Sequence, residues 1–168
     1  CGRFYLSRIG SSASVTIVAH GRSALFIGGD ISMSQRLTIT LDPTAELDVV
    51  VGGSIGVSAP LTLGSPNYPA LTRVYIGATR GFNVSSESTL GANFYVPNGP
   101  IGTSSALEVY GGVFTQNLSA SSTVSVHYDR AVSRAGEGCR TPTTPVPGDG
   151  GVSTDAGPRD ADGREVTP

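Results

Sequence analysis

Residues that commonly perform catalysis are few in this chain, and their spacing does not favour it. The two histidines, His20 and His127, fall in the first and the last of the repeats described below, too far apart to share a metal. His127 and Asp129, in VHYD, could form a hydrogen-bonded pair, but no nucleophile motif such as G-x-S-x-G accompanies them. No His or Cys cluster has the spacing of metal ligands. We therefore predict that the protein is not an enzyme and holds no metal and no cofactor.

Carboxylates are the other catalytic candidates, because β-helical enzymes that act on polysaccharides need clustered carboxylates or an arginine base in a groove. Asp42 stands in LDPT, a turn signature. The segments at 28–30 and 52–53 are typical of corners, not of a phosphate loop, because no helix follows them. The acids before Asp129 are predicted mainly at corners and loops, without a paired outward column: Asp30, Asp42, Glu46, Asp48, Glu87 and Glu108. A polysaccharide-active enzyme is therefore the least favoured function.

A row of large apolar residues is the strongest candidate for a binding or assembly surface. It comes from five strand-like runs, LFIGG, VVVGG, VYIG, FYVPN and VFTQN, in which the residue before the last inward position should point outward. The outward residues are Phe26, Val50, Tyr75, Tyr95 and Phe114. Spaced by about 4.8 Å, an uncovered row would form a patch able to bind a partner chain, a glycan or a second copy. The alternative is that residues 4–9, or a helix at 129–135, cover it.

The elements that must position this row are short repeated strands. Alternating runs such as VTI, LTI and LTL end on apolar anchors spaced by 22, 24, 27, 19 and 17 residues: Ile17, Ile39, Leu63, Leu90, Val109 and Val126. A serine stands five residues before each anchor: Ser12, Ser34, Ser58, Ser85, Ser104 and Ser121. We predict that these serines form a structural corner column, whose hydroxyls bond nearby backbone and stack from coil to coil.

A column of mostly hydroxyl-bearing residues is predicted on the outside of the same strands, one residue before each anchor. Its members are Thr16, Thr38, Thr62, Thr89, Glu108 and Ser125. Some ice-binding proteins present such columns, but they carry a regular T-x-T pair on each coil, and only Thr38 and Thr40 form one here. We interpret the column as β-branched residues that fill exposed strand positions.

These periods predict an all-β fold, a single-stranded parallel β-helix of about five to six coils that encloses a dry column of Val, Ile and Leu. Varying coil lengths favour a right-handed helix. A mixed sandwich is the alternative fold, but it would not explain corners and anchors that recur in one order. A short helix from Asp129 is predicted to cap the last coil.

Composition divides the chain into a domain at 1–139 and a disordered Pro-, Gly- and Asp-rich linker or tail at 140–168. The net charge is −2, and residues 1–139 hold eight acids and eight arginines. No basic patch favours nucleic acid, and no apolar run of about 18 residues predicts a membrane span.

Cys1 and Cys139 bracket the domain, which predicts a disulfide in an oxidising compartment. Two free thiols, or Cys1 as a lipid-modified first residue, are the alternatives. The start at Cys1 suggests a processed piece.

The runs ALFIGGDI, ELDVVVGGSI, NFYVPN and SVHYDRAV resemble β-helical domains of large myxobacterial and related bacterial cell-surface proteins, some of them similar to pilus-associated proteins. The likeness covers residues 1–139. A more distant resemblance is to the bactofilin-like, polymer-forming β-helix, whose coils are shorter and more uniform. The resemblance implies a non-catalytic structural or adhesive module, extracellular or on the cell surface, with periplasmic or outer-membrane-anchored placement as alternatives. Expected partners are other domains of the same protein, a glycan or a second copy; a carbohydrate-binding module is the second interpretation.

Overall fold

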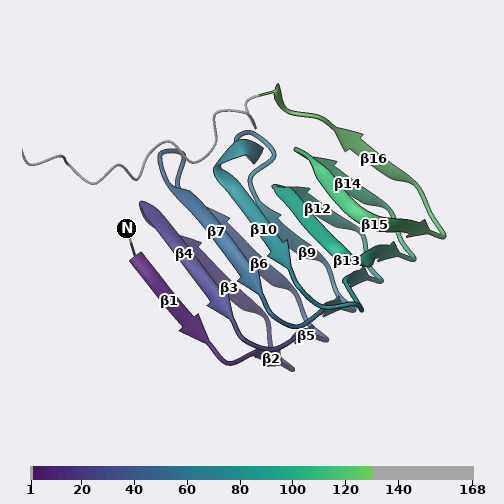
Figure 1. Cartoon of the computed structure of the whole chain (residues 1–168), viewed down its shortest axis with the longest axis horizontal. Helices are drawn as coiled ribbons and strands as arrows, with labels where there is room; N and C mark the ends of the chain where they lie inside the picture. Colours follow the sequence, from purple (N-terminus) through teal and green to yellow (C-terminus); the bar gives the residue numbers. More distant parts are fainter. Residues whose placement is uncertain (1, 131–168) are drawn as a thin grey trace, which may run out of the picture.

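Alternation of buried apolar residues with exposed polar or small residues builds the strands of this chain. In Glu46–Val51, for example, Leu47, Val49 and Val51 are buried while the residues between them face outward. Such strands cannot bury their inner face alone, so successive coils stack and pair side by side. The structure, a computed structural model that describes residues 2–130, is a parallel β-solenoid (Figure 1). The predicted all-β parallel fold is confirmed.

Two sheets form the walls. The six-stranded sheet takes one strand from each of six coils: β3 (Val15–Ala19), β6 (Leu37–Leu41), β9 (Leu61–Gly64), β12 (Ser88–Gly91), β14 (Leu107–Tyr110) and β16 (Val124–His127). The ten-stranded sheet has a first wing of β1 (Gly2–Leu6), β4 (Arg22–Ile27), β7 (Glu46–Val51) and β10 (Thr72–Ile76). Its second wing contains β2 (Ile9–Ser11), β5 (Ile31–Met33), β8 (Ile55–Val57) and β11 (Phe82–Val84). The long strands β13 (Asn93–Thr103) and β15 (Val113–Ala120) run through both wings, and η1 (Pro69–Leu71) is a single 3₁₀ turn.

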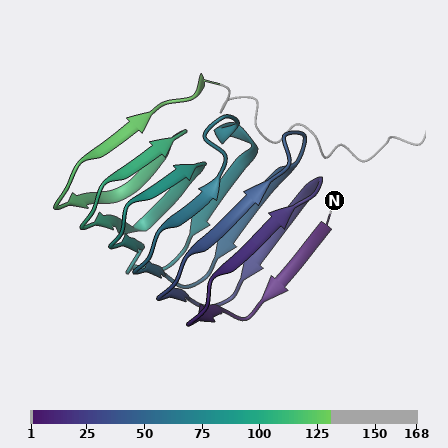
Figure 2. The ribbon, with the colours of Figure 1, turned by 180° about the vertical axis from the view of Figure 1, so that it is seen from behind.

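Strand pairing is parallel throughout residues 2–130, which excludes the sandwich alternative. Seen from behind, the coils lie as a stack with β1 at one end and β16 at the other (Figure 2). The six predicted anchors form one unbroken column through the six-stranded sheet. The four central anchors are buried, whereas Val126 in the last coil is 51% exposed. The hydroxyl-bearing column also pairs in register, Thr16 beside Thr38 and Glu108 beside Ser125.

The serine column lies where it was predicted, each serine directly after a strand of the second wing. Backbone N–H groups make this corner: that of Ser58 donates to the carbonyl of Met33 at 2.9 Å, and that of Ser85 donates to Val57 at 3.1 Å. In two coils the residue after the column serine bonds to the neighbouring coil: Ser86 Oγ donates to the Ser58 carbonyl at 2.8 Å, and Ser105 Oγ donates to the Ser85 carbonyl at 2.9 Å. The column therefore marks a corner in every coil, and a structural role for its hydroxyl groups stays a prediction.

One corner of the stack can be built only with glycine. Gly64 has φ +75°, and a Cβ there would overlap the carbonyl oxygen of Gly91 in the next coil. Gly64 is the last residue of β9, where the chain leaves the six-stranded sheet for the loop before η1. A side chain at Gly64 would be both strained and excluded from the space available.

Three predictions concern the ends of the chain. Residues 4–9 do not cover the predicted apolar row of Phe26 to Phe114; they lie in and between β1 and β2, which add further strands to the two wings. The Cys1–Cys139 disulfide and the tail at 140–168 lie outside the described residues, as does the predicted capping helix beyond Arg130. Among residues 2–130, no helix is long and apolar enough to cross a membrane.

Candidate binding face on the first wing

The predicted apolar row exists, and the stacking of coils extends it by one residue. Its members occupy one outward column of the first wing: Tyr5, Phe26, Val50, Tyr75, Tyr95 and Phe114. We call these six residues the aromatic row. Tyr5 was missed in the sequence, although Phe4-Tyr5-Leu6 has the same in-out-in pattern as LFI in β4. From the sequence, these residues are considered only as a cover for the row and not as a strand that contributes to it.

The row is open to solvent along its length. Tyr5 is 70% exposed, Tyr95 is 46% exposed and Phe114 is 59% exposed. Phe26 and Tyr75 are exposed to a smaller degree, and Val50 is half-buried between them. Neither residues 4–9 nor any other described segment buries the row. Tyr75 and Tyr95 are both exposed, so within residues 2–130 the row is available as a binding surface.

Packing between the rings makes the row rigid near its C-terminal end. Tyr95 and Phe114 stack with centroids 5.0 Å apart and planes 18° apart. Tyr75 meets Tyr95 edge to face at 6.3 Å. Both arrangements are favoured by the quadrupoles of aromatic rings. Because the backbone beneath is a hydrogen-bonded sheet, the three rings form a preorganised platform.

Glycines occupy several of the outward positions on one flank of the row. Two residues after the row, the outward positions are Gly28, Gly52 and Gly77. A Cβ added at Gly28 would lie 2.5 Å from the hydroxyl oxygen of Tyr5, so the Tyr5 ring needs glycine beneath it. Glycine thus stands beside the row in three coils, whereas Ser7, Pro97 and Gln116 occupy the same position in the other three.

A charged network borders the other flank, and it corrects the prediction that the acids lack a paired outward arrangement. Glu46 and Asp48 both face outward on β7, between Arg22 of β4 and Arg73 of β10. Arg73 Nε donates to Asp48 Oδ1 at 2.5 Å and Nη2 donates to Glu46 Oε2 at 3.0 Å. Arg22 Nη1 donates to Glu46 Oε2, and Arg22 Nη2 lies 3.7 Å from Asp48 Oδ2. The four charges cancel.

The network is partly desolvated, which affects Arg73 most. Its side chain is 11% exposed, against 20% for Glu46 and 24% for Asp48. Burial acts to lower the pKa of Arg73, but hydrogen bonds and charge from Asp48 and Glu46 outweigh it and raise the pKa above its ordinary value. Both carboxylates are engaged by arginines. The pair therefore braces β4, β7 and β10 and does not offer a free acid and base.

A shallow groove lies between the network and the rings. It has a volume of about 380 Å³ and is lined by Arg73, Asn93, Tyr75, Tyr95 and Phe114, among others. Asn93 Oδ1 accepts a hydrogen bond from the Gly112 N–H at 2.8 Å, which fixes its amide at the groove edge. The groove thus places polar groups beside aromatic faces, as ligand sites commonly do.

The histidines lie away from this face. His20 Nδ1 is 2.7 Å from Asp42 Oδ2 in an exposed pair that the sequence did not predict, although Val18 and Thr40, two residues before each, are partners in β3 and β6. His127 stacks on Tyr110 with ring centroids 4.5 Å apart. In the part of the chain that the structure describes, no group of three or more His, Cys, Asp or Glu residues could hold a metal ion.

Comparison with known proteins adds one finding. A family model described as "Domain of unknown function (DUF7305)" matches residues 1–135. That range contains the sixteen strands found among residues 2–130 and the whole aromatic row. No curated protein and no solved structure matches the chain.

Proposed function

The chain belongs to the family DUF7305, a domain of unknown function, and from its surface we propose that it is a non-catalytic adhesive module of an exported bacterial cell-surface protein. The observation that carries the proposal is the aromatic row. Exposing a contiguous row of large apolar side chains costs solubility, and such patches mark interaction sites. The solenoid holds the row at fixed spacing, so binding a partner requires little loss of conformational entropy in this surface.

A second candidate, carbohydrate binding, is favoured by the groove. Sugar rings carry apolar C–H faces and hydroxyl rims, and the groove offers both complements. Tyr95 and Phe114 supply flat rings, while Arg73 and Asn93 stand at the edge. Adhesion and glycan binding would use the same face, so the two candidates differ in the ligand and not in the site.

The polysaccharide-active enzyme remains the least favoured function. The adjacent pair of acids on this face, Glu46 and Asp48, is hydrogen-bonded to Arg73 and paired with Arg22. Glycoside hydrolysis needs one carboxyl group to deliver a proton and another to act as base or nucleophile. Because both carboxylates are bound by arginines, the pair supports a structural role and not these catalytic roles.

Export is supported by the predicted Cys1–Cys139 disulfide and by the resemblance to bacterial cell-surface proteins. Fractionation of a native host, with an antibody against residues 1–139, tests this part of the proposal. Detection in the medium or on intact cells is expected, and confinement to the cytoplasm would contradict it.

The binding face is tested by removing its two stacked rings. Purified chain is screened on a glycan array and on cell-wall polysaccharide, beside the double variant Tyr95→Ala/Phe114→Ala. Ligands retained by the native chain are expected to lose about tenfold or more in affinity, the scale of two anchor residues. Tyr68→Ala is the matched control, because Tyr68 is 47% exposed in a loop outside the row. Equal binding by all three proteins would show that another surface is used.

A further inference from the structure

We propose that the two ends of the solenoid are complementary, so that the last coil of one copy stacks on the first coil of the next. Both ends expose side chains that register assigns to the core. Phe4 is 59% exposed and Leu6 is 38% exposed in the first coil, while Leu118 is 47% exposed and Val126 is 51% exposed in the last. In the columns between them the corresponding residues are almost fully buried, for example Ile27 at 1%.

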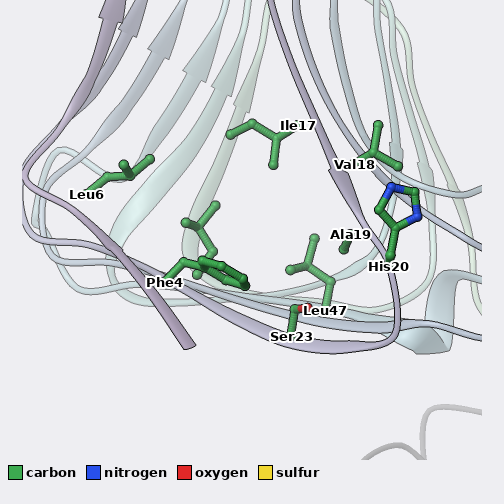
Figure 3. Close-up of a pocket in the computed structure, with 9 residues that line it drawn as sticks. Phe4, Leu6, Ile17, Val18, Ala19, His20, Ser23 and Leu47 are labelled. Atoms are coloured by element: carbon green, nitrogen blue, oxygen red, sulfur yellow. The ribbon is translucent and has the colours of Figure 1, made fainter. Parts of the chain in front are cut away.

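The first coil also opens into a cavity of about 400 Å³, shown in Figure 3. Phe4 and Leu6 line it from β1, Ile17 and Ala19 line it from β3, and Leu47 of β7 also contributes to the lining. The lining is largely apolar, and the edges of β1 and β3 beside it have one strand partner each among the described residues. Open edges of this kind accept a further strand.

The number of residues between successive inward positions indicates that the last coil of another copy fits this end. Five residues separate Phe4 from Ile9 in the first coil and Val113 from Leu118 in the last. The same step takes six, six, eight and seven residues in the coils between, as in Val74 to Phe82. At the next corner, the number of residues between the corresponding inward positions is the same in all six coils. The first and last coils therefore have the same strand-to-strand path, which no intermediate coil shares.

The side chains match as well as the spacing. Placing the first coil of a second copy on the last coil would align residues of one kind in each column: Phe4 with Val113, Tyr5 with Phe114, Ile9 with Leu118, Val15 with Val124, Thr16 with Ser125 and Ile17 with Val126. The core, the aromatic row and the hydroxyl-bearing column would all continue without a shift. If the alternation of β16 continues past His127, Tyr128 would align with Ala19 of the second copy, which lines the cavity. Tyr128 is 71% exposed.

Charge distinguishes this arrangement from contact between two first coils. Residues 2–20 contain Arg3 and Arg8 and no acid, so two such ends would bring four arginines together. The last coil, residues 113–130, holds one acid and one arginine, Asp129 and Arg130, and imposes no such repulsion. Head-to-tail stacking also preserves parallel pairing. Because it joins two different surfaces without a closing rotation, it leads to open rows of copies.

Sedimentation velocity of the full chain over a range of concentration tests the proposal. The native chain is expected to show a mass that rises with concentration. Phe4→Asp and Val126→Asp each place a charge on an exposed core position of one end, and each is expected to weaken association about tenfold or more. Circular dichroism of both variants checks that they remain folded. Tyr68→Asp, on the lateral loop, is expected to associate like the native chain.

Mixing the two end variants gives the decisive result. Each variant keeps one intact end, so a 1:1 mixture is expected to form heterodimers and nothing longer, while each alone stays monomeric. A native chain that remains monomeric up to about 1 mM would overturn the proposal. So would self-association of Val126→Asp alone with loss only in Phe4→Asp, which would indicate contact between two first coils.

Discussion

At the scale of single residues, the charged groups of this protein act as braces between coils. Asp30 is an example: its Oδ1 accepts hydrogen bonds from the Ser54 N–H at 2.7 Å and the Ser54 hydroxyl at 3.0 Å, one coil away. These bonds, the backbone one first, lower the pKa of Asp30 below its ordinary 3.8. Asp30 thus links two successive coils at their corner.

The lowered pKa makes a pH-dependent contribution to stability. A depressed carboxyl pKa stabilises the folded state fully above the unfolded value of 3.8, and that contribution is lost as pH falls through the lower folded value. We expect Asp30→Asn to reduce the loss of stability between about pH 5 and pH 2. Urea unfolding midpoints of both proteins across this range provide the measurement. Parallel pH profiles would show that Asp30 does not titrate differently on folding.

Arg73 is the residue on which the charged network depends. Its side chain is 11% exposed and engages two carboxylates on the neighbouring strand. Arg73→Met keeps much of the apolar stem but leaves Glu46 and Asp48 with only Arg22, so we expect a loss of about 1–3 kcal/mol in the free energy of unfolding. Arg36→Met is the exposed control, expected within about 0.5 kcal/mol of the native chain.

A double-mutant cycle separates the ion pair from the packing of the stem. If the network matters as charge, Asp48→Asn should cost less in the Arg73→Met background than in the native chain. Additive costs would assign the effect to packing alone.

At the scale of elements, corners are the least tolerant part of the solenoid. Gly64 combines a positive φ with contact between its coil and that of Gly91, so Gly64→Ala is expected to destabilise by about 2 kcal/mol or more. Gly56 provides a matched control: it faces outward from β8, and an added Cβ would meet nothing within 4 Å. Gly56→Ala should be neutral or slightly stabilising. Thermal unfolding of the two variants distinguishes a steric effect specific to the Gly64 corner from a destabilising effect common to all substitutions of glycine.

Strand positions and columns were predictable because two short-range signals agree. Alternation fixes which face each residue occupies, and the Ser at a constant distance before Ile39 or Leu63 fixes where each strand begins. The outward column from Phe26 to Phe114 followed from the same alternation. What failed were features that depend on which coil lies beside which.

The charged network shows why. Glu46 and Asp48 alternate with Leu47 and Val49 as outward strand residues, yet the sequence around them resembles a loop after LDPT. Their arginine partners are 24 to 27 residues away, and register makes them neighbours. Tyr5 was missed for a similar reason, since the first run has no earlier coil to reveal it as a repeat. Pairing between coils is a tertiary property, and one sequence carries it only indirectly.

At the scale of the whole molecule, stability should vary along the stack. Each coil contacts only its neighbours, so a central coil has two partners and an end coil has one. Leu63 and Leu118 both face the core, but Leu63 is 1% exposed and Leu118 is 47% exposed. We expect Leu63→Ala to cost about 2–5 kcal/mol and Leu118→Ala to cost about 1 kcal/mol or less. Chemical unfolding at low protein concentration gives both values, and equal costs would contradict the end-to-centre gradient.

The same gradient offers an independent view of assembly. In dilute solution, amide hydrogens of β1, β2 and β16 should exchange faster than those of β7 and β10, because edge strands open without unfolding their neighbours. If copies stack head to tail, a rise in concentration buries both ends together and should slow exchange in β1 and β16 by the same factor. Exchange in the loop at 65–68, on the lateral surface, should not change. Mass spectrometry of exchanged peptides makes the comparison, and protection of β1 without protection of β16 would be incompatible with a contact that needs one of each.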